Sequence, residues 1–298
     1  MRSLIAAALI LLLPESPAFA HASEPHTTWW VWTFDPYIVV PLALVGGLYL
    51  IGSWRLRARS QGTHGIGGRE LAFASGWITL AAALVSPLHW LGEHLFTFHM
   101  IEHEIVMAIS APLIVLARPI AALLWGLPRR ARLSAGRLMR TNPVSSAWEF
   151  LSRGSLATFI HGIAIWAWHA PVLFDAAVEN VALHRLQHLS FFLTAILFWW
   201  SVFWRSNRGA AAWHLFITTL HTGALGALMA LSPRVLYVMQ TRTADEWGLT
   251  PLEDQQLAGL MMWIPAGTIY VGAALVMAAR WIATSSTGAQ NVQRASSS

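Results

Sequence analysis

Two pairs of histidines have the spacing of metal ligands on one face of a helix. His99 and His103 lie in the segment LFTFHMIEHEIVM, and His184 and His188 lie in LHRLQHLSFF. Residues four positions apart in an α-helix share a face, so each pair can present two imidazoles to one centre. Both pairs fall near the same end of their apolar segments, so they can lie at a similar depth. We therefore predict a metal or haem site built from these four histidines.

Three further side chains could complete such a site. Glu102 lies on the helix face of His99 and His103. Its carboxylate can accept a hydrogen bond from the ring N–H of a ligand imidazole whose other nitrogen binds the metal. Met107 follows His103 by four residues and offers a soft thioether sulfur. His169 is expected on the same side of the membrane and is a weaker candidate ligand.

The choice of metal depends on which ligands the chain has. The sequence contains 13 histidines, 9 methionines and no cysteine. Imidazole binds copper, zinc, iron and nickel, and copper(I) also accepts thioether sulfur. Without cysteine there are no disulfides and no thiolate ligands, and histidine and methionine are the only soft ligands left. We therefore predict copper as the bound metal, ahead of zinc.

Other functions fit the same histidines. Two histidines on facing helices also ligate haem, so a membrane b-type cytochrome with bis-histidine haem ligation is one alternative. A membrane hydrolase, in which histidines hold zinc and Glu102 or Asp175 acts as the base, is another. In a third, the chain is a structural scaffold and the histidines only join its helices by hydrogen bonds.

The composition is that of a membrane protein. Of 298 residues, 56% are hydrophobic and only 11% are charged, whereas a soluble domain has about 25% charged residues. A membrane-spanning helix needs about 20 apolar residues, and Ile120–Leu127 is too short for one, so we expect it to lie at the interface. Seven segments are long enough: Pro36–Trp54, Glu70–Leu88, Leu95–Ala117, Ser155–Phe174, His184–Trp204, Trp213–Ser232 and Leu257–Trp281. The predicted fold class is all-α, a polytopic seven-helix transmembrane bundle.

The first twenty residues have the pattern of a secretory signal peptide. Arg2 provides a short positive region, Leu4–Leu13 an apolar region, and Ala18–Ala20 a cleavage site. Cleavage would leave His21 as the N-terminus outside the cytoplasm, where its amine and imidazole could chelate an ion. We thus predict three parts: a signal peptide over 1–20, a seven-helix domain over 21–282 and a disordered cytoplasmic tail over 283–298.

The basic residues indicate the orientation in the membrane. All 19 are arginines, and with the mature N-terminus outside, 15 of them fall on the inner side. Only Arg185, Arg234 and Arg242 fall on the outer side. This bias follows the positive-inside rule and places the C-terminus in the cytoplasm. It also explains the basic isoelectric point, so we expect no nucleic-acid partner.

Three segments together resemble the CtaG family of membrane-embedded cytochrome c oxidase assembly factors, which is associated with caa-type oxidases. They are SPLHWLGEHLFTFHMIEHEIVM (Ser86–Met107), WHAPVLFDAAVENVALHRLQHLSFF (Trp168–Phe192) and DQQLAGLMMWIPAG (Asp254–Gly267). The resemblance extends from about Asp35 to Trp281. A cysteine-bearing copper chaperone shares the family's name in some bacteria, but the absence of cysteine excludes it here.

The resemblance implies a non-enzymatic protein of the bacterial inner membrane that helps to mature the oxidase by supplying copper to its binuclear centre. Oxidase subunits and the lipid bilayer would be its partners, together with a copper donor that the sequence does not identify. His99, His103, His184 and His188 carry over as the functional positions. In the family, glutamine is commoner at the position of Glu102 and glutamate at that of Gln187, an exchange that would keep one acid between the two helices.

Overall fold

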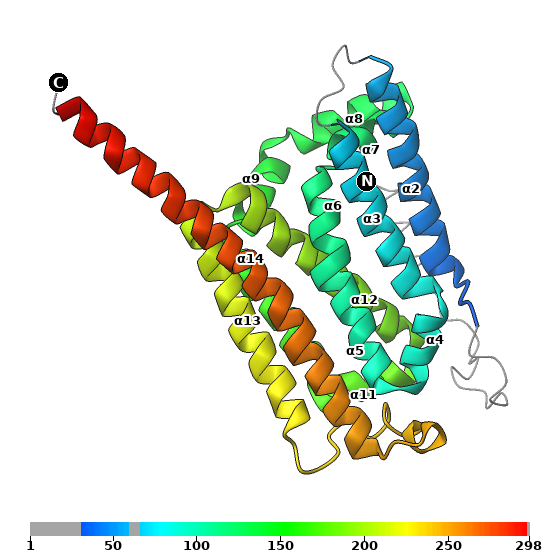
Figure 1. Cartoon of the computed structure of the whole chain (residues 1–298). Helices are drawn as coiled ribbons and strands as arrows, with labels where there is room; N and C mark the ends of the chain where they lie inside the picture. The colour runs from blue at the N-terminus through cyan, green and yellow to red at the C-terminus, as the bar shows by residue number, and fades with distance from the viewer. Residues whose placement is uncertain (1–30, 60–65, 297–298) are drawn as a thin grey trace.

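The computed structural model describes residues 31–59 and 66–296, which are helical with no strand (Figure 1). The predicted signal peptide and His21 lie outside these residues. Helices of the first half are α2 (Pro36–Arg57), α3 (Ile66–Val85), α4 (Pro87–His94), α5 (Phe96–Glu104), η1 (Ile105–Ser110), α6 (Ala111–Ala117), α7 (Ile120–Gly126) and α8 (Arg129–Met139). Those of the second half are α9 (Asn142–Leu151), α10 (Gly154–Trp168), α11 (Pro171–Glu179), α12 (Val181–Trp200), η2 (Ser201–Arg205), α13 (Arg208–Ala230), η3 (Ala244–Trp247) and α14 (Pro251–Ser296).

Several of these helices are long and apolar enough to cross a membrane. Four qualify on their own, and two bent pairs raise the number to as many as six. The all-helical class and the membrane-helix character are therefore confirmed. The count of seven stays a prediction, because α13, which occupies the sixth predicted span, is not among these candidates in the described part of the chain.

The two segments that carry the histidine pairs lie at the centre of the bundle. The first is the span Phe96–Ala117, made of α5, η1 and α6, and 72% of its most apolar stretch is buried inside the protein. The second is Val181–Arg205, for which this share is 44%. The corresponding values for the spans of α2 and α14 are 11% and 17%, so these helices lie at the periphery. Figure 1 shows α5 and α12 between the flanking helices.

Two prolines break predicted spans and bend their ends over the central helices. The axis turns by 46° between α3 and α4 and by 71° between α10 and α11. Pro87 and Pro171 open α4 and α11. Proline has no N–H to donate, and its ring clashes with the carbonyl four residues earlier, so a new helix begins at each. As a result, α4 packs on α5 and α11 packs on α12.

The two central segments are held in register through a tryptophan. Residues Ile105–Ser110 form a π-helical turn, in which backbone carbonyls lose their usual partners. The fully buried Trp199 of α12 donates its indole N–H to the carbonyl of Met107, with an N···O distance of 2.9 Å. This bond lies one turn beyond His103 along the chain and therefore helps to fix α12 relative to α5.

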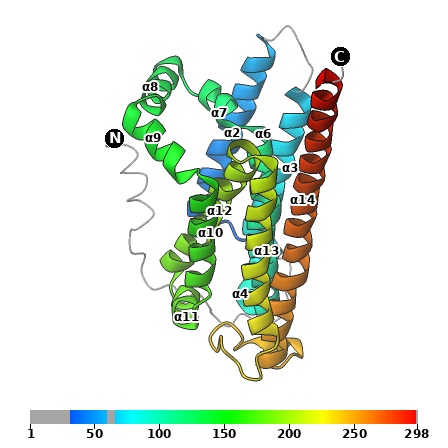
Figure 2. The ribbon, with the colours of Figure 1, turned by 90° about the vertical axis from the view of Figure 1, so that its left-hand side faces the viewer.

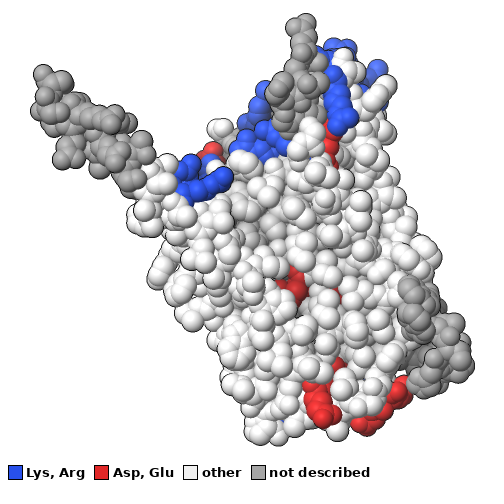
Figure 3. All heavy atoms as spheres, viewed as in Figure 1, with Lys and Arg blue, Asp and Glu red and all other residues white. Residues whose placement is uncertain are grey.

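The charged residues separate along the bundle. Figure 3 shows arginines gathered at the end of the molecule that carries α8, and a group of acids at the opposite end. In Figure 2 the short helices α8 and α9 lie across that arginine-rich end. There α14 also extends past the bundle: it remains helical to Ser296, within the segment for which the sequence predicts a tail.

Candidate metal site

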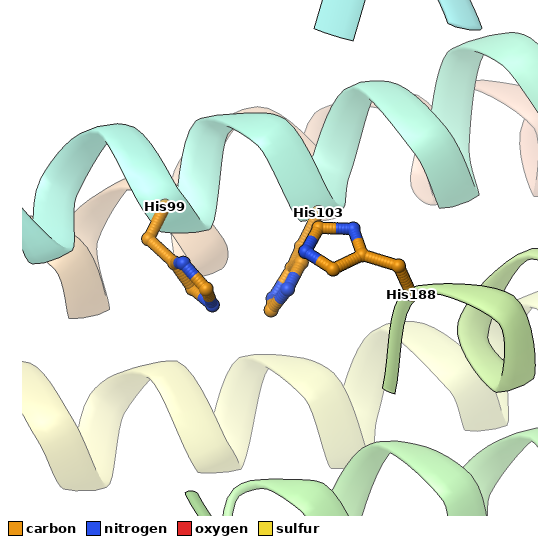
Figure 4. A group of neighbouring side chains, drawn as sticks. All are labelled: His99, His103 and His188. Carbon is orange, nitrogen blue, oxygen red and sulfur yellow. The ribbon is translucent and has the colours of Figure 1, made fainter. Parts of the chain in front are cut away.

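Three buried histidines from the two central segments converge on one point. His99 and His103 project from α5 and His188 from α12, and Figure 4 shows the three rings turned toward one another. One ligand nitrogen of each lies within 4.8 Å of the others. Metal–nitrogen bonds of about 2.0–2.1 Å would require the nitrogens to approach to about 3.5 Å in a trigonal site, which small side-chain rotations can supply.

These imidazoles lack the hydrogen bonds that buried polar groups normally make. Among the described residues, Nε2 of His99, both ring nitrogens of His103 and Nδ1 of His188 are buried without a hydrogen-bond partner. Each such group costs about 1–3 kcal/mol when left unsatisfied. His161 and His221, outside the cluster, also have unpartnered ring nitrogens, so the missing hydrogen bonds alone do not indicate a ligand site. Their combination with the convergence of three imidazoles favours a ligand site over a structural role.

His184 lies at the rim of this cluster. Its Nε2 is 2.8 Å from Nε2 of His188, and the two rings are stacked with centroids 4.6 Å apart. The ring of His184 is also 5.5 Å from that of His99. The two predicted pairs therefore do face each other. His184, which is only half-buried, contacts the group of three instead of belonging to it.

Glu102 is completely buried and connects the cluster to α4. Its Oε1 accepts a hydrogen bond from Nδ1 of His89 at 2.8 Å and lies 3.7 Å from Nδ1 of His188. Its partners thus come from neighbouring helices and not from His99 or His103 on its own helix. His89 was not a predicted ligand. Pro87, at the start of its helix, marks a possible break in the predicted span, but it does not show where the helix after the break packs.

A glycine makes room for Glu102 against α4. A Cβ atom on Gly92 would lie 3.1 Å from Oε2 of Glu102 and 3.2 Å from the Cα of His99. The Gly92 carbonyl also accepts a hydrogen bond from the side chain of Gln240 at 2.8 Å. The backbone of α4 therefore approaches α5 closely at the level of the cluster, and a side chain at this position would force Glu102 or the backbone of α5 to shift by a few tenths of an ångström.

His169 lies next to the cluster, with its ring near that of His103. It follows the last residue of α10, is 3% exposed, and its ring centroid is 6.2 Å from that of His103. Its Nδ1 bonds the Ile165 carbonyl at 2.7 Å, which assigns the proton to Nδ1 and leaves Nε2 as a buried lone pair with no partner in the described chain. His169 lies outside the group of three, and its role as a ligand stays a prediction.

A tyrosine fixes the backbone at His169. Tyr237, in the loop before α14, donates its hydroxyl to the His169 carbonyl at 2.7 Å. Burial, with a smaller contribution from the Asp175 carboxylate, raises the pKa of Tyr237 to about 12. The hydroxyl therefore keeps its proton, and the bond persists over the whole physiological pH range.

Met107 lies in the hydrophobic core next to the π-helical turn. It is 2% exposed and belongs to a cluster that includes Met100, Phe191 and Trp199. The prediction that its sulfur shares a face with His103 assumed a regular α-helix, and the wider π-turn changes that register. Its role as a ligand stays a prediction.

The start of α5 is set by an aspartate from another helix. Leu95, which precedes α5, offers no side-chain cap. Instead, the fully buried carboxylate of Asp254 accepts hydrogen bonds from the amides of Phe96 and Thr97 at 2.8 and 3.0 Å, and from the Thr97 hydroxyl at 2.7 Å. Because a helix N-terminus favours an anion, this contact positions the first turn of α5, and with it His99.

A cavity of about 400 Å³ reaches the cluster from one side. Its walls are mostly apolar and come from α2, α3 and α12, while His89, His184 and His188 line one part of it. Asp35 and Arg185 also line it, and they form an ion pair with Nε 2.9 Å from Oδ2. His184 is thus the more exposed end of a short path from the cavity to the buried histidines.

Replacing Glu102 with glutamine is expected to weaken metal binding without abolishing it. The substitution keeps the shape of the side chain but removes the charge that orients His89 and faces His188. Loss of such a partner costs about 10–100-fold in metal affinity. Competition with a copper(I) chelator of known affinity would measure the change. An unchanged affinity would show that the Glu102 charge has no influence on the site.

Comparison with known proteins shows which family the chain belongs to. Residues 47–284 match the family described as cytochrome c oxidase caa3 assembly factor (Caa3_CtaG). The chain belongs to this family. The match covers every residue of the histidine cluster and all of the described helices from the middle of α2 to the apolar part of α14, so the predicted membership in the Caa3_CtaG family is confirmed.

More distant relatives of this Caa3_CtaG chain occur in mycobacteria. An uncharacterized protein of Mycobacterium leprae is 27% identical over 180 residues, which cover 58% of this chain and 26% of that protein. Uncharacterized proteins of Mycobacterium bovis and Mycobacterium tuberculosis are each 24% identical over 261 residues, covering 84% of this chain and 38% of each relative. The chain therefore spans well under half the length of these relatives. No solved structure matches it.

Proposed function

We propose that this oxidase assembly factor binds one copper ion between His99, His103 and His188 and supplies it for maturation of the oxidase metal centre. The observation that carries the proposal is the convergence of three buried imidazoles, each of which has a ring nitrogen without a hydrogen-bond partner among the described residues. In the proposed role copper is the cargo, so the site must release it as well as bind it. Three neutral nitrogens suit copper(I), which accepts low coordination numbers.

The proposed setting is the bacterial inner membrane, with the cluster toward the outer side. The arginine-rich end would face the cytoplasm by the positive-inside rule. Figure 1 shows α4, α5 and α11 toward the opposite end of the bundle from α8. A site in that part of the molecule suits delivery to an oxidase subunit in the same membrane.

The packing around the rings favours a compact ion over a haem. The rings of His99 and His103 lie 4.3 Å apart on one helix. Phe174 packs against His99 and Phe191 against His103, with centroid distances of 5.3 and 4.8 Å. Axial histidines of a haem would instead have to face each other across a flat macrocycle.

In this proposal the cavity is the access route for copper, and His184 is its first ligand there. Because His99 and His103 are each only 1% exposed, an ion must pass a more accessible group to reach them. His184 lines the cavity and contacts His188 directly. It would therefore take the ion from the cavity and pass it to the three buried histidines.

Replacing His184 with alanine is expected to slow copper loading by about tenfold or more while leaving one bound ion at equilibrium, since a first-contact ligand acts on the association rate. Stopped-flow mixing with copper(I), followed by metal analysis after equilibration, would measure both quantities. An unchanged rate, or loss of the bound ion at equilibrium, would exclude this role for His184.

Cells that lack the chain provide the test of function. We expect them to lose oxidase activity, to regain part of it in excess copper, and to regain all of it with the wild-type chain. The His103→Ala chain should fail to restore activity. The matched control is His161→Ala, which removes another fully buried histidine that lies outside the cluster. Restoration by the His103→Ala chain, or the absence of any copper effect, would refute copper supply.

A further inference from the structure

A second cavity of about 400 Å³ lies at the arginine-rich end of the molecule. It is bounded by the end of α2, the end of α7 and the start of α8. Its lining has no acidic residue but includes four arginines and two tryptophans: Arg55, Arg59, Arg129, Arg132, Trp54 and Trp125. Four guanidinium groups around one cavity repel one another unless an anion lies between them.

Three of the four arginines of this cavity are oriented by contacts with α7. Arg55 donates through Nη1 to the carbonyls of Trp125 and Gly126, at 2.8 and 3.2 Å, and so caps the C-terminus of α7. The guanidinium carbons of Arg59 and Arg132 lie over the Trp125 ring, 4.8 and 4.0 Å from its centroid. Such stacking orients the planar groups, and their remaining N–H donors match the geometry of a phosphate.

An exposed apolar face of α2 leads to the same cavity. Leu50 is 68% exposed and Trp54 is 69% exposed, and their spacing places them on one face of the helix. Ala58, four residues further on, lines the cavity together with Trp54. A bound molecule could therefore place apolar chains along α2 and an anionic group among the arginines.

We propose that this cavity binds the phosphate group of an anionic phospholipid, whose acyl chains lie along the exposed face of α2. Basic pockets at the cytoplasmic end of membrane helices commonly hold such headgroups. A bound lipid would brace α2 and α7, which are packed against each other, to the amphipathic helix α8. The proposal is independent of copper binding, because none of its residues belongs to the histidine cluster.

Native mass spectrometry of the full chain in detergent would test the proposal. The probes are phosphatidylglycerol, phosphatidylcholine of the same chain length, and inorganic phosphate as a competitor. The test variant is Arg59→Gln/Arg132→Gln. The matched control is Arg137→Gln/Arg140→Gln, which removes the same charge from exposed arginines that bond only the carbonyls of their own helical turn and do not line the cavity.

The wild-type chain is expected to retain one phosphatidylglycerol in preference to phosphatidylcholine. At about 1 kcal/mol for each arginine near the membrane surface, the test variant should bind it about tenfold or more weakly, and the control should bind it like wild type. Equal losses in both variants would show only a general charge effect. Equal binding of the two lipids, or displacement by millimolar phosphate, would likewise overturn a lipid site.

Discussion

Replacing His103 with alanine is expected to remove copper from the purified chain. Both ring nitrogens of His103 are buried without a hydrogen-bond partner among the described residues, and its ring lies 4.3 Å from that of His99 and 4.9 Å from that of His188. Loss of a direct ligand should reduce affinity by on the order of 100-fold or more, beyond the effect of losing an outer hydrogen-bond partner. Metal analysis after washing with a copper(I) chelator would show the loss.

The control for this variant must also lose a buried imidazole. His161→Ala does so in the same bundle, because His161 is fully buried between α10 and α12, where its Nδ1 lies 3.0 Å from Thr194 Oγ1. We expect the His161→Ala chain to retain copper and the His103→Ala chain to keep its helical content. If the two variants lost copper equally, general destabilisation would explain the result and the assignment of His103 as a ligand would fail.

Replacing Asp254 with alanine is expected to cause the largest loss of stability among the single substitutions considered. The change removes a buried carboxylate that accepts three hydrogen bonds from the first turn of α5. It leaves the amide of Phe96 unsatisfied in a buried position and that of Thr97 unsatisfied in a partly buried one. The expected cost is about 2–4 kcal/mol, measured as a lower unfolding midpoint of the detergent-solubilised chain.

Asp254→Asn is the matched variant for this prediction. Its amide oxygen can still accept from one backbone N–H, whereas the charge that favours a helix N-terminus is gone. We therefore expect a loss of stability smaller than that of the alanine variant. Exposed Glu253, the preceding residue, provides a further control: its carboxylate accepts hydrogen bonds from Thr250 in an exposed position, so Glu253→Ala should cost clearly less than Asp254→Ala. A stability of Asp254→Ala equal to wild type would contradict the capping role.

The helical periodicity of the histidines was predictable from the sequence, because spacing alone places residues four apart on one face. Their convergence was not, since no local pattern states which helix lies opposite which. The structure supplies this information through the Trp199–Met107 contact and the contact of Asp254 with α5, both of which join residues far apart in the chain.

The apolar runs identified the membrane helices but not their shapes. Pro87 and Pro171 lie within or beside predicted spans, and a hydropathy profile does not say whether such a proline kinks a helix or ends it. The end that bends at Pro87 brings His89 next to Glu102, whereas His169 lies at the end of α10, just before the bend at Pro171. For that reason the sequence identified the paired histidines more clearly than the groups that surround them.

The predicted partners of Glu102 and Met107 depended on regular helix geometry. Glu102 shares a helix with His99 and His103, but its hydrogen bond goes to α4, which the bend at Pro87 brings over the site. Met107 falls in the π-helical turn, where the register of the helix changes. Departures from ideal geometry of this kind result from packing between helices and have no clear mark in the sequence.

X-ray absorption at the copper edge of the purified, copper(I)-loaded wild-type chain tests the central claim most directly. The account predicts one copper per chain, coordinated by about three imidazole nitrogens at about 2.0 Å, a typical metal–imidazole distance. It also predicts that this signal is lost in the His103→Ala chain. A chain that retains no copper, a coordination shell dominated by sulfur, or a Soret band from bound haem in the same preparation would contradict it.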